Sequence, residues 1–117
     1  MTPAENRKET LKQLRAARKS MISKAWLLSL KDQPEKVRRE AAVELLNIEQ
    51  AILELSNTTL SDIRDKLVEN KADLLKGREN LEEALARLTC VKTVLKAVGD
   101  VLVVVGKVVK FVATAAA

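Results

Sequence analysis

A leucine repeat with a period of seven residues constrains the fold of this chain more than any other feature. Leucine fills seven successive positions of the repeat and valine the eighth: Leu60, Leu67, Leu74, Leu81, Leu88, Leu95, Leu102 and Val109. The positions three residues later are mostly apolar too: Ile63, Asn70, Gly77, Ala84, Val91, Val98, Val105 and Val112. This 3–4 spacing is typical of a helix that packs against another helix along its length. The strict period further predicts a left-handed supercoil.

The sequence as a whole predicts an all-α fold. We expect an antiparallel helical bundle with coiled-coil-like packing, built from three long helices at about residues 3–30, 35–55 and 59–113. Aromatic residues make up only 2% of the chain and charged residues 32%, and cores made of Leu, Ile, Val and Ala are typical of such bundles. The length suits one helical domain over residues 1–117.

Three short segments predict where the helices begin and end. Thr2, Pro3 and Glu5 have the spacing of a capping box with proline in the first helical turn. Pro34 predicts a break, with Asp32 or Gln33 capping the second helix. The weaker break at residues 56–59 consists of four residues that are poor helix formers. A single helix from residue 35 onward is the alternative, because the leucine phase extends back to Leu46 and Leu53.

The predicted third helix leaves two alternatives open. Gly77 could end one helix and give four in all, but the leucine repeat runs across it, which favours a continuous helix that a neighbour approaches closely. Residues 101–109 around Gly106 could form a β-hairpin because valine favours strands. The continuing 3–4 repeat favours a helix there too.

The segment from Val91 to Ala117 is unusually apolar, with ten valines and five charged residues. We expect these charges to form a narrow polar strip on an otherwise apolar helix. A third helix this long would extend past the first two, so a monomer would leave its end exposed as a large apolar patch. Other copies of the chain or lipid would then cover it. The residues predicted to form an interface between helices of different molecules are Leu60, Ile63, Leu67, Leu74, Leu81, Leu88, Leu95, Val98, Leu102, Val105, Val109 and Val112.

Membrane activity is the alternative use of the same segment. Its composition is similar to that of the insertable segments of α-helical pore-forming toxins. Basic residues dominate both ends of the chain: residues 1–31 hold eight basic and two acidic residues, and residues 91–117 hold four and one. Such ends suit an anionic membrane surface. The residues predicted to meet the membrane are Trp26, Lys92, Lys96, Val101, Leu102, Val103, Val104, Lys107, Lys110 and Phe111.

Residue types argue against catalysis. The chain has no histidine and one cysteine, Cys90, which we expect to be a small apolar residue in a helix contact. It also lacks a glycine-rich phosphate loop. We therefore predict no catalytic residue, metal site or cofactor, and no enzyme. Nucleic acid is an unlikely partner, because the basic first helix matches no recognised binding motif.

The most direct prediction is a self-associating, non-enzymatic helical protein that forms an oligomer through the leucine repeat and the apolar C-terminal helix. The alternatives are insertion of residues 91–117 into membranes, and an adaptor or inhibitor that binds a different helical protein. We expect the polar N-terminus not to act as a secretory signal. We expect a cytoplasmic location, with peripheral membrane binding or leaderless secretion as alternatives.

Overall fold

Helices account for most of residues 1–111, which are the residues that the computed structural model describes. Six helices follow one another within this range: α1 (Pro3–Ser20), α2 (Lys24–Lys31), α3 (Glu35–Asn57), α4 (Leu60–Glu69), α5 (Lys71–Leu85) and α6 (Val91–Val108). The described residues contain no strand. The all-α prediction is therefore confirmed, whereas the prediction of three long helices is wrong.

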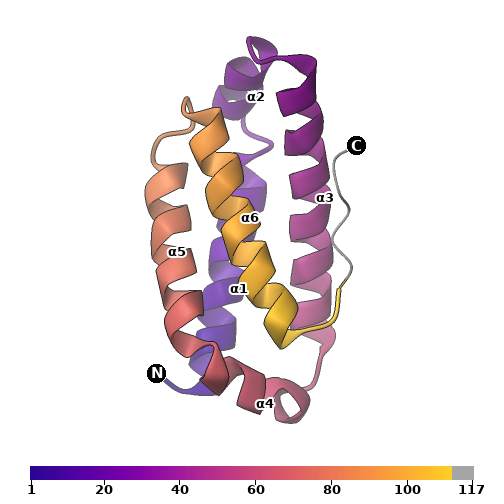
Figure 1. The fold of residues 1–117 in the computed structure, drawn as a ribbon, viewed down its shortest axis with the longest axis vertical. Helices are drawn as coiled ribbons and strands as arrows, with labels where there is room; N and C mark the ends of the chain where they lie inside the picture. Colours follow the sequence, from indigo (N-terminus) through magenta and orange to yellow (C-terminus); the bar gives the residue numbers. More distant parts are fainter. Residues whose placement is uncertain (112–117) are drawn as a thin grey trace.

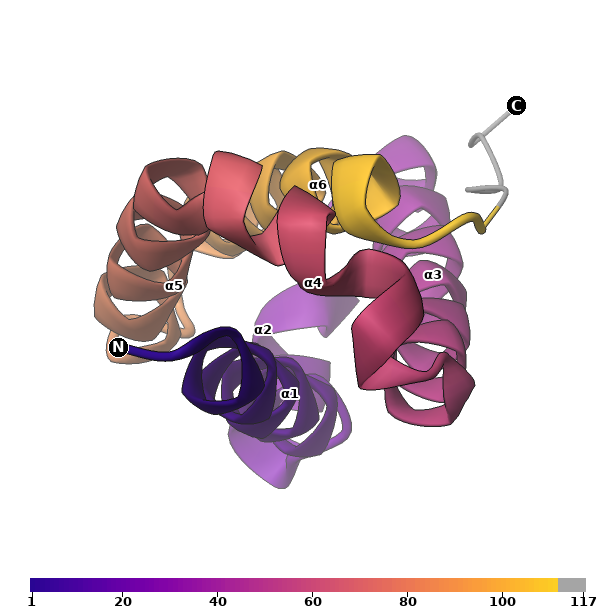
Figure 2. The ribbon, with the colours of Figure 1, turned by 90° about the horizontal axis from the view of Figure 1, so that it is seen from below.

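The four longer helices stand side by side around one core. Around this ring, α1 packs against α3, α3 against α6, α6 against α5, and α5 against α1. Figure 1 shows α1 and α5 running in one direction and α3 and α6 in the other. The short helices α2 and α4 lie at opposite ends, as Figures 1 and 2 show. The molecule measures 44 × 27 × 18 Å.

The first predicted helix divides into α1 and α2. Its start is as predicted, because Thr2 and Glu5 form the capping box. The break at residues 21–23 was missed. There the Ser23 hydroxyl donates to the Ser20 carbonyl oxygen at 2.6 Å and accepts from the Trp26 amide at 3.3 Å, which caps α2. The turn buries the Trp26 side chain, which is 1% exposed. Burial of this indole favours two helices over one straight one.

The second predicted helix is α3. It begins after the break at Pro34, as predicted, and it ends at Asn57, two residues later than expected. Pro34 itself is the N-cap and no side chain caps the helix, so the cap predicted at Asp32 or Gln33 is wrong. The break at residues 56–59 is confirmed, because α3 ends before Thr58 and α4 begins after Thr59. The alternative of one continuous helix from residue 35 is wrong.

The third predicted helix divides into α4, α5 and α6. Asn70 ends α4 and begins α5, and residues 86–90 form the turn into α6. A straight helix over residues 59–113 would be roughly 80 Å long, about twice the longest dimension of the molecule. Folding it back lets α6 pack against α5 and α3 in the same chain. The prediction that the C-terminal apolar helix is left uncovered is therefore wrong for the described residues, which end at 111.

Gly77 lies inside α5, so the predicted continuity there is confirmed and the break at Gly77 is wrong. A methyl group at Gly77 would come within 3.1 Å of the Val101 Cγ2 atom. Glycine at this position thus allows α5 and α6 to approach closely. Residues 101–108 are helical, so the β-hairpin alternative is also wrong.

Candidate functional site

The residues predicted as an interface lie mainly inside the single chain. Buried members come from α4, α5, α6 and the residue after α6, and form one core with parts of α1 and α3: Ile63, Leu67, Leu74, Leu81, Leu95, Val98, Leu102, Val105 and Val109. Leu60 and Leu88 are half-buried against this core, and Val112 lies outside the described residues. A contact between copies through these residues would require the helices to separate.

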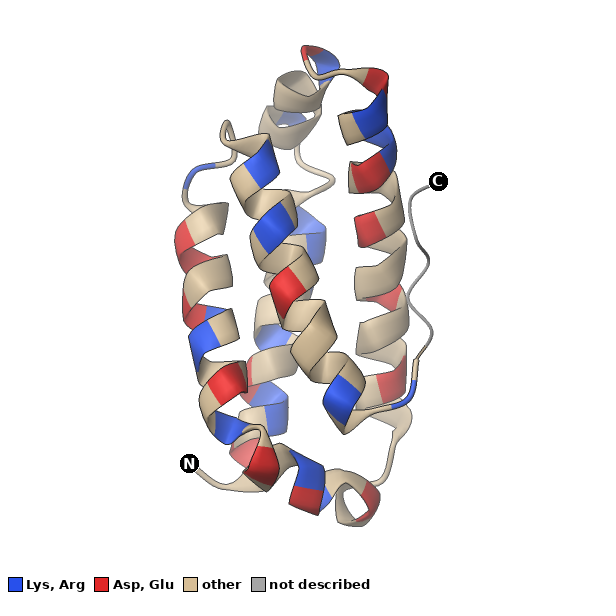
Figure 3. Cartoon of the chain, in the orientation of Figure 1, with Lys and Arg blue, Asp and Glu red and all other residues tan. Residues whose placement is uncertain are grey.

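The residues predicted to meet a membrane fall into two groups. Trp26, Val101 and Leu102 are buried, and Val104 and Phe111 are partly buried against the core. Val103 and the four lysines of the set, Lys92, Lys96, Lys107 and Lys110, are exposed. Figure 3 shows charged residues along the outer side of α6, as expected for its polar strip. Within residues 1–111, none of the helices is both long and apolar enough to cross a bilayer.

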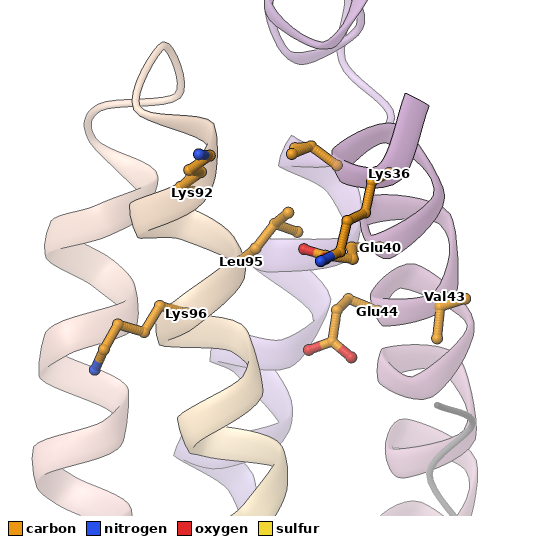
Figure 4. Close-up of a pocket in the computed structure, with 8 residues that line it drawn as sticks. Lys36, Glu40, Val43, Glu44, Lys92, Leu95 and Lys96 are labelled. Atoms are coloured by element: carbon orange, nitrogen blue, oxygen red, sulfur yellow. The ribbon is translucent and has the colours of Figure 1, made fainter. Parts of the chain in front are cut away.

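A groove of about 550 Å³ lies between the upper parts of α3 and α6. Leu95 points toward α3 across it, and Glu40 and Glu44 extend from α3, as Figure 4 shows. Lys36 lies beside Glu40, whereas Lys96 points away from α3. The Glu44 carboxylate accepts a hydrogen bond from the side-chain amide of Asn47 at 3.1 Å. The groove combines an apolar floor with charges of both signs.

A buried polar cluster at the lower end connects α1, α4 and α5. The Arg78 guanidinium donates to the Asn6 side-chain oxygen and, at 3.0 Å, to the Thr10 hydroxyl. Asn6 in turn donates to the Leu67 carbonyl oxygen at 3.3 Å. Burial lowers the pKa of Arg78, while the nearby carboxylates of Glu9 and Glu79 act in the opposite direction. Every partner is a neutral acceptor on the same chain, so the cluster fixes how the helices pack.

Sequence reasoning did not find this cluster. Arg78 follows Gly77 in α5, one residue outside the leucine repeat, and it resembles any solvent-facing arginine in the sequence. Asn6 and Thr10 are four residues apart on one face of α1. Two polar residues on this buried face were the feature of the sequence that could have indicated the cluster.

Cys90 is exposed at the start of α6, so the prediction that it is packed in a helix contact is wrong. It is the N-cap residue of α6 and makes no side-chain capping bond. Among residues 1–111, no three side chains of Cys, Asp and Glu converge as metal ligands would.

A partly apolar row of side chains lies on the outer face of α3. It consists of Val43, Leu46, Gln50 and Leu53, spaced three and four residues apart; Gln50 is polar, and Val43 and Gln50 are half-buried. Leu46 is 45% exposed and Leu53 is 57% exposed. The opposite face of the helix, with Ile48 and Leu55, is buried in the core. Such spacing on the exposed side of a helix is what a second helix would pack against. We name these four residues the α3 stripe.

Charges on α3 are distributed unevenly along the stripe. The first part of the helix carries three acidic and three basic side chains: Glu35, Glu40, Glu44, Lys36, Arg38 and Arg39. Glu49 and Glu54 farther along are acidic. Figure 3 shows blue and red together near the upper end of α3 and red farther down. Arg39 pairs with Glu35 at 3.2 Å. The upper part of α3 is therefore close to neutral, and its lower part is acidic.

Comparison with protein-family models, with curated proteins and with solved structures gives no match for this chain. Any functional assignment therefore depends on the chain's own residues.

Proposed function

We propose that this protein is a non-enzymatic, self-associating helical protein, and that it associates through the α3 stripe. The observation that carries the proposal is the exposure of Leu46 and Leu53 on one face of the longest helix. Single exposed leucines are common on protein surfaces, but a row at helical spacing is typical of a helix–helix contact. The association differs from the one that the leucine repeat predicts, because most of that repeat is occupied within the chain.

The rest of the molecule supports a binding role over a chemical one. The groove between α3 and α6 has no nucleophile and base in contact, and the Arg78 cluster uses neutral partners of the same chain. The exposed residues of α6 are mostly charged, with Val103 as the large apolar exception, whereas α3 exposes Leu46 and Leu53 among its charged residues. Association through one exposed helix face buries a small area, so we expect a weak, concentration-dependent oligomer.

Analytical ultracentrifugation of the full-length protein over a micromolar concentration range tests the proposal. We expect the sedimentation coefficient to rise with concentration, and Leu46→Glu to abolish the rise. Leu75→Glu is the matched control, because Leu75 is 47% exposed on α5 and lies outside the stripe. A full-length protein that stays monomeric at every concentration would refute self-association. If Leu46→Glu leaves association intact, another surface is responsible.

Vesicle flotation with the same samples tests the membrane alternative. Most apolar residues of α6, though not Val103, are enclosed by α5 and α3, so we expect no flotation that depends on residues 91–117. Flotation that is lost when the chain is shortened to end at Thr89 would instead favour membrane insertion. Co-purification of a different protein in equal amount would favour the adaptor alternative.

A further inference from the structure

We infer that the outer face of α1 and α2 binds the surface of an anionic lipid membrane, with the exposed leucines of α2 entering the headgroup region. This face lies outside the α3 stripe and outside residues 91–117, so the inference goes beyond the proposed self-association and does not depend on it. Three of the nine large apolar side chains exposed within residues 1–111 fall between residues 22 and 28: Ile22 at 59%, Leu27 at 55% and Leu28 at 57%. Exposed apolar side chains gathered in this way mark an interaction surface.

The short helix α2 holds its leucines in a fixed orientation. Its inner face carries Trp26, whose side chain is 1% exposed, and the Ser23 hydroxyl caps its start. Lys24, Leu28 and Lys31 follow at spacings of four and three residues and are all exposed, so they share the outer face of the helix. Leucine between lysines on one helix face suits a membrane interface, because the leucine enters the apolar layer while the ammonium groups stay among the headgroups.

A row of basic side chains extends this face along α1. The row consists of Lys8, Lys12, Arg15 and Lys19, at spacings of four, three and four residues, and all four are exposed. Such spacing places them on one side of the helix, opposite the side on which Leu14 and Ala17 are buried. The row is roughly 16 Å long. None of its members is in an ion pair within residues 1–111, so their charges are available to a partner.

Acidic side chains are scarce in this part of the chain. Residues 10–31 hold six basic residues and no acidic one. The acidic residues that flank this range in the sequence are Glu5, Glu9, Asp32 and Glu35. Glu9 is half-buried and lies near Arg78, and Glu35 pairs with Arg39 at 3.2 Å. The face therefore has a net positive charge, which is complementary to an anionic surface.

The shape of this surface favours a membrane over a protein as its partner. The leucines project from a helix of about two turns at one end of the bundle, as Figure 1 shows for α2. A bilayer accepts such a convex surface without a complementary groove. Each basic residue close to an anionic leaflet strengthens binding by about fivefold, and the apolar side chains add to this attraction. Binding of this kind requires no helix that spans the bilayer.

Vesicle flotation of the full-length protein tests the inference. The vesicles contain phosphatidylcholine alone or an equal mixture with phosphatidylserine, and each is used at low and high salt. We expect flotation only with the mixed vesicles, and a marked loss at high salt because the charges are screened. No flotation with the mixed vesicles at low salt would overturn the inference. Equal flotation with both kinds of vesicle would also overturn it, since the basic row would then contribute nothing.

Matched variants assign the contact to this face. Leu28→Ser should weaken binding to the mixed vesicles by about fivefold or more, because it removes a side chain that enters the membrane. Val103→Ser is its control, since Val103 is 65% exposed on α6. Lys24→Glu should weaken binding by about 10-fold or more, with the exposed Lys107→Glu on α6 as control. Variants of α6 that weaken binding as much as those of α2 would overturn the assignment.

A fluorescent label measures whether α2 enters the membrane. A dye sensitive to polarity is attached to Leu28→Cys in a Cys90→Ser background, because Cys90 is exposed. We expect its emission to shift to shorter wavelength with the mixed vesicles, and the same dye on Val103→Cys to show no shift. Flotation without a shift at residue 28 would overturn the entry of α2. Binding of soluble polyglutamate as strong as that of vesicles would favour an acidic protein partner and overturn the membrane as the partner.

Leu46→Glu separates this inference from the proposed function. We expect this substitution in the α3 stripe to abolish self-association and to leave flotation with the mixed vesicles unchanged. A protein that is monomeric at every concentration but still floats would refute the proposed self-association and support the membrane contact. Loss of flotation in Leu46→Glu would show that the α3 stripe is needed for it and would overturn the assignment to α1 and α2.

Discussion

The close approach of α5 and α6 at Gly77 gives a quantitative test of the fold. Replacing Gly77 by alanine should favour the helix by about 0.8–1.0 kcal/mol, since glycine is a poor residue in a helix interior. The added methyl group, however, would lie 3.1 Å from Val101 Cγ2 and 3.8 Å from its Cα atom. Overpacking of this kind costs about 1–3 kcal/mol. Because Val101 is only 2% exposed, its side chain has little room to move. We therefore expect Gly77→Ala to lower the free energy of unfolding by about 1 kcal/mol.

A double-mutant cycle isolates the contact. Val101→Ala alone should destabilise the protein by about 2 kcal/mol through the cavity it leaves. In that background the Gly77→Ala methyl group has space, so it should stabilise by about 1 kcal/mol through helix propensity. The two substitutions should thus be coupled by about 2 kcal/mol. Urea unfolding followed by circular dichroism measures each corner of the cycle, at one protein concentration.

Gly106→Ala is the matched control in α6. A methyl group there would meet only the Phe111 Cε1 atom, at 3.8 Å, which is an ordinary contact. We expect a gain of up to about 1 kcal/mol from helix propensity. If Gly77→Ala were as stabilising as Gly106→Ala and showed no coupling to Val101, the close packing of α5 against α6 at this point would be refuted.

Three further predictions test the core, the polar cluster and the helix cap. Leu81→Ala should lower the free energy of unfolding by about 2–5 kcal/mol at every protein concentration, because Leu81 is 0% exposed within one chain. The control Leu75→Ala should change the free energy of unfolding by less than about 0.5 kcal/mol. An effect of Leu81→Ala that depends on protein concentration would instead place this residue between copies. Asn6→Ala should lower the free energy of unfolding, measured in urea, by about 3 kcal/mol, because it removes a hydrogen-bond partner of the buried Arg78 charge. Asn80→Ala on the exposed face of α5 is the control. A small and equal effect of the two substitutions would contradict a structural role for the cluster. The pKa of Glu5 is lowered from 4.5 by its hydrogen bonds with Thr2. The contribution of Glu5 to stability should therefore be present above pH 4.5 and lost as the pH falls through the lower pKa of the folded state. The free energy of unfolding should fall less steeply with acid for Glu5→Gln than for the unmodified protein, and identical curves would contradict this linkage.

The leucine period predicted many of the buried residues better than it predicted the path of the chain. Leu67, Leu74 and Leu81 are all at most 2% exposed, although the chain bends between the first two. The bend at Asn70 does not shift the repeat, because the backbone bonds continue across it: the Asn70 amide donates to the Lys66 carbonyl oxygen at 3.0 Å, and the Leu74 amide donates to that of Asn70 at 2.9 Å. A side-chain pattern with a fixed period carries no sign of such a bend.

The turn between α5 and α6 was missed for a different reason. It contains neither glycine nor proline, which are the residues that most reliably mark a break. The available signal was the change of composition at Val91, where α6 begins. A helix that contacts α5 on one side and α3 on another needs a wide apolar face. The many valines of α6 are thus explained by its contacts with α5 and α3 in the same chain. From the sequence alone, they had indicated contact with another molecule.

Two leucines in the same phase of the repeat show why a period alone cannot identify a partner. Leu53 and Leu67 are fourteen residues apart, two full repeats, yet Leu53 is 57% exposed and Leu67 is 1% exposed. The break at Thr58 and Thr59 lies between them and sets the direction of α4 independently of α3. In α3 the core instead contacts the face with Ile48 and Leu55. The leucine phase of this helix, with Leu46 and Leu53, consequently points to the protein surface.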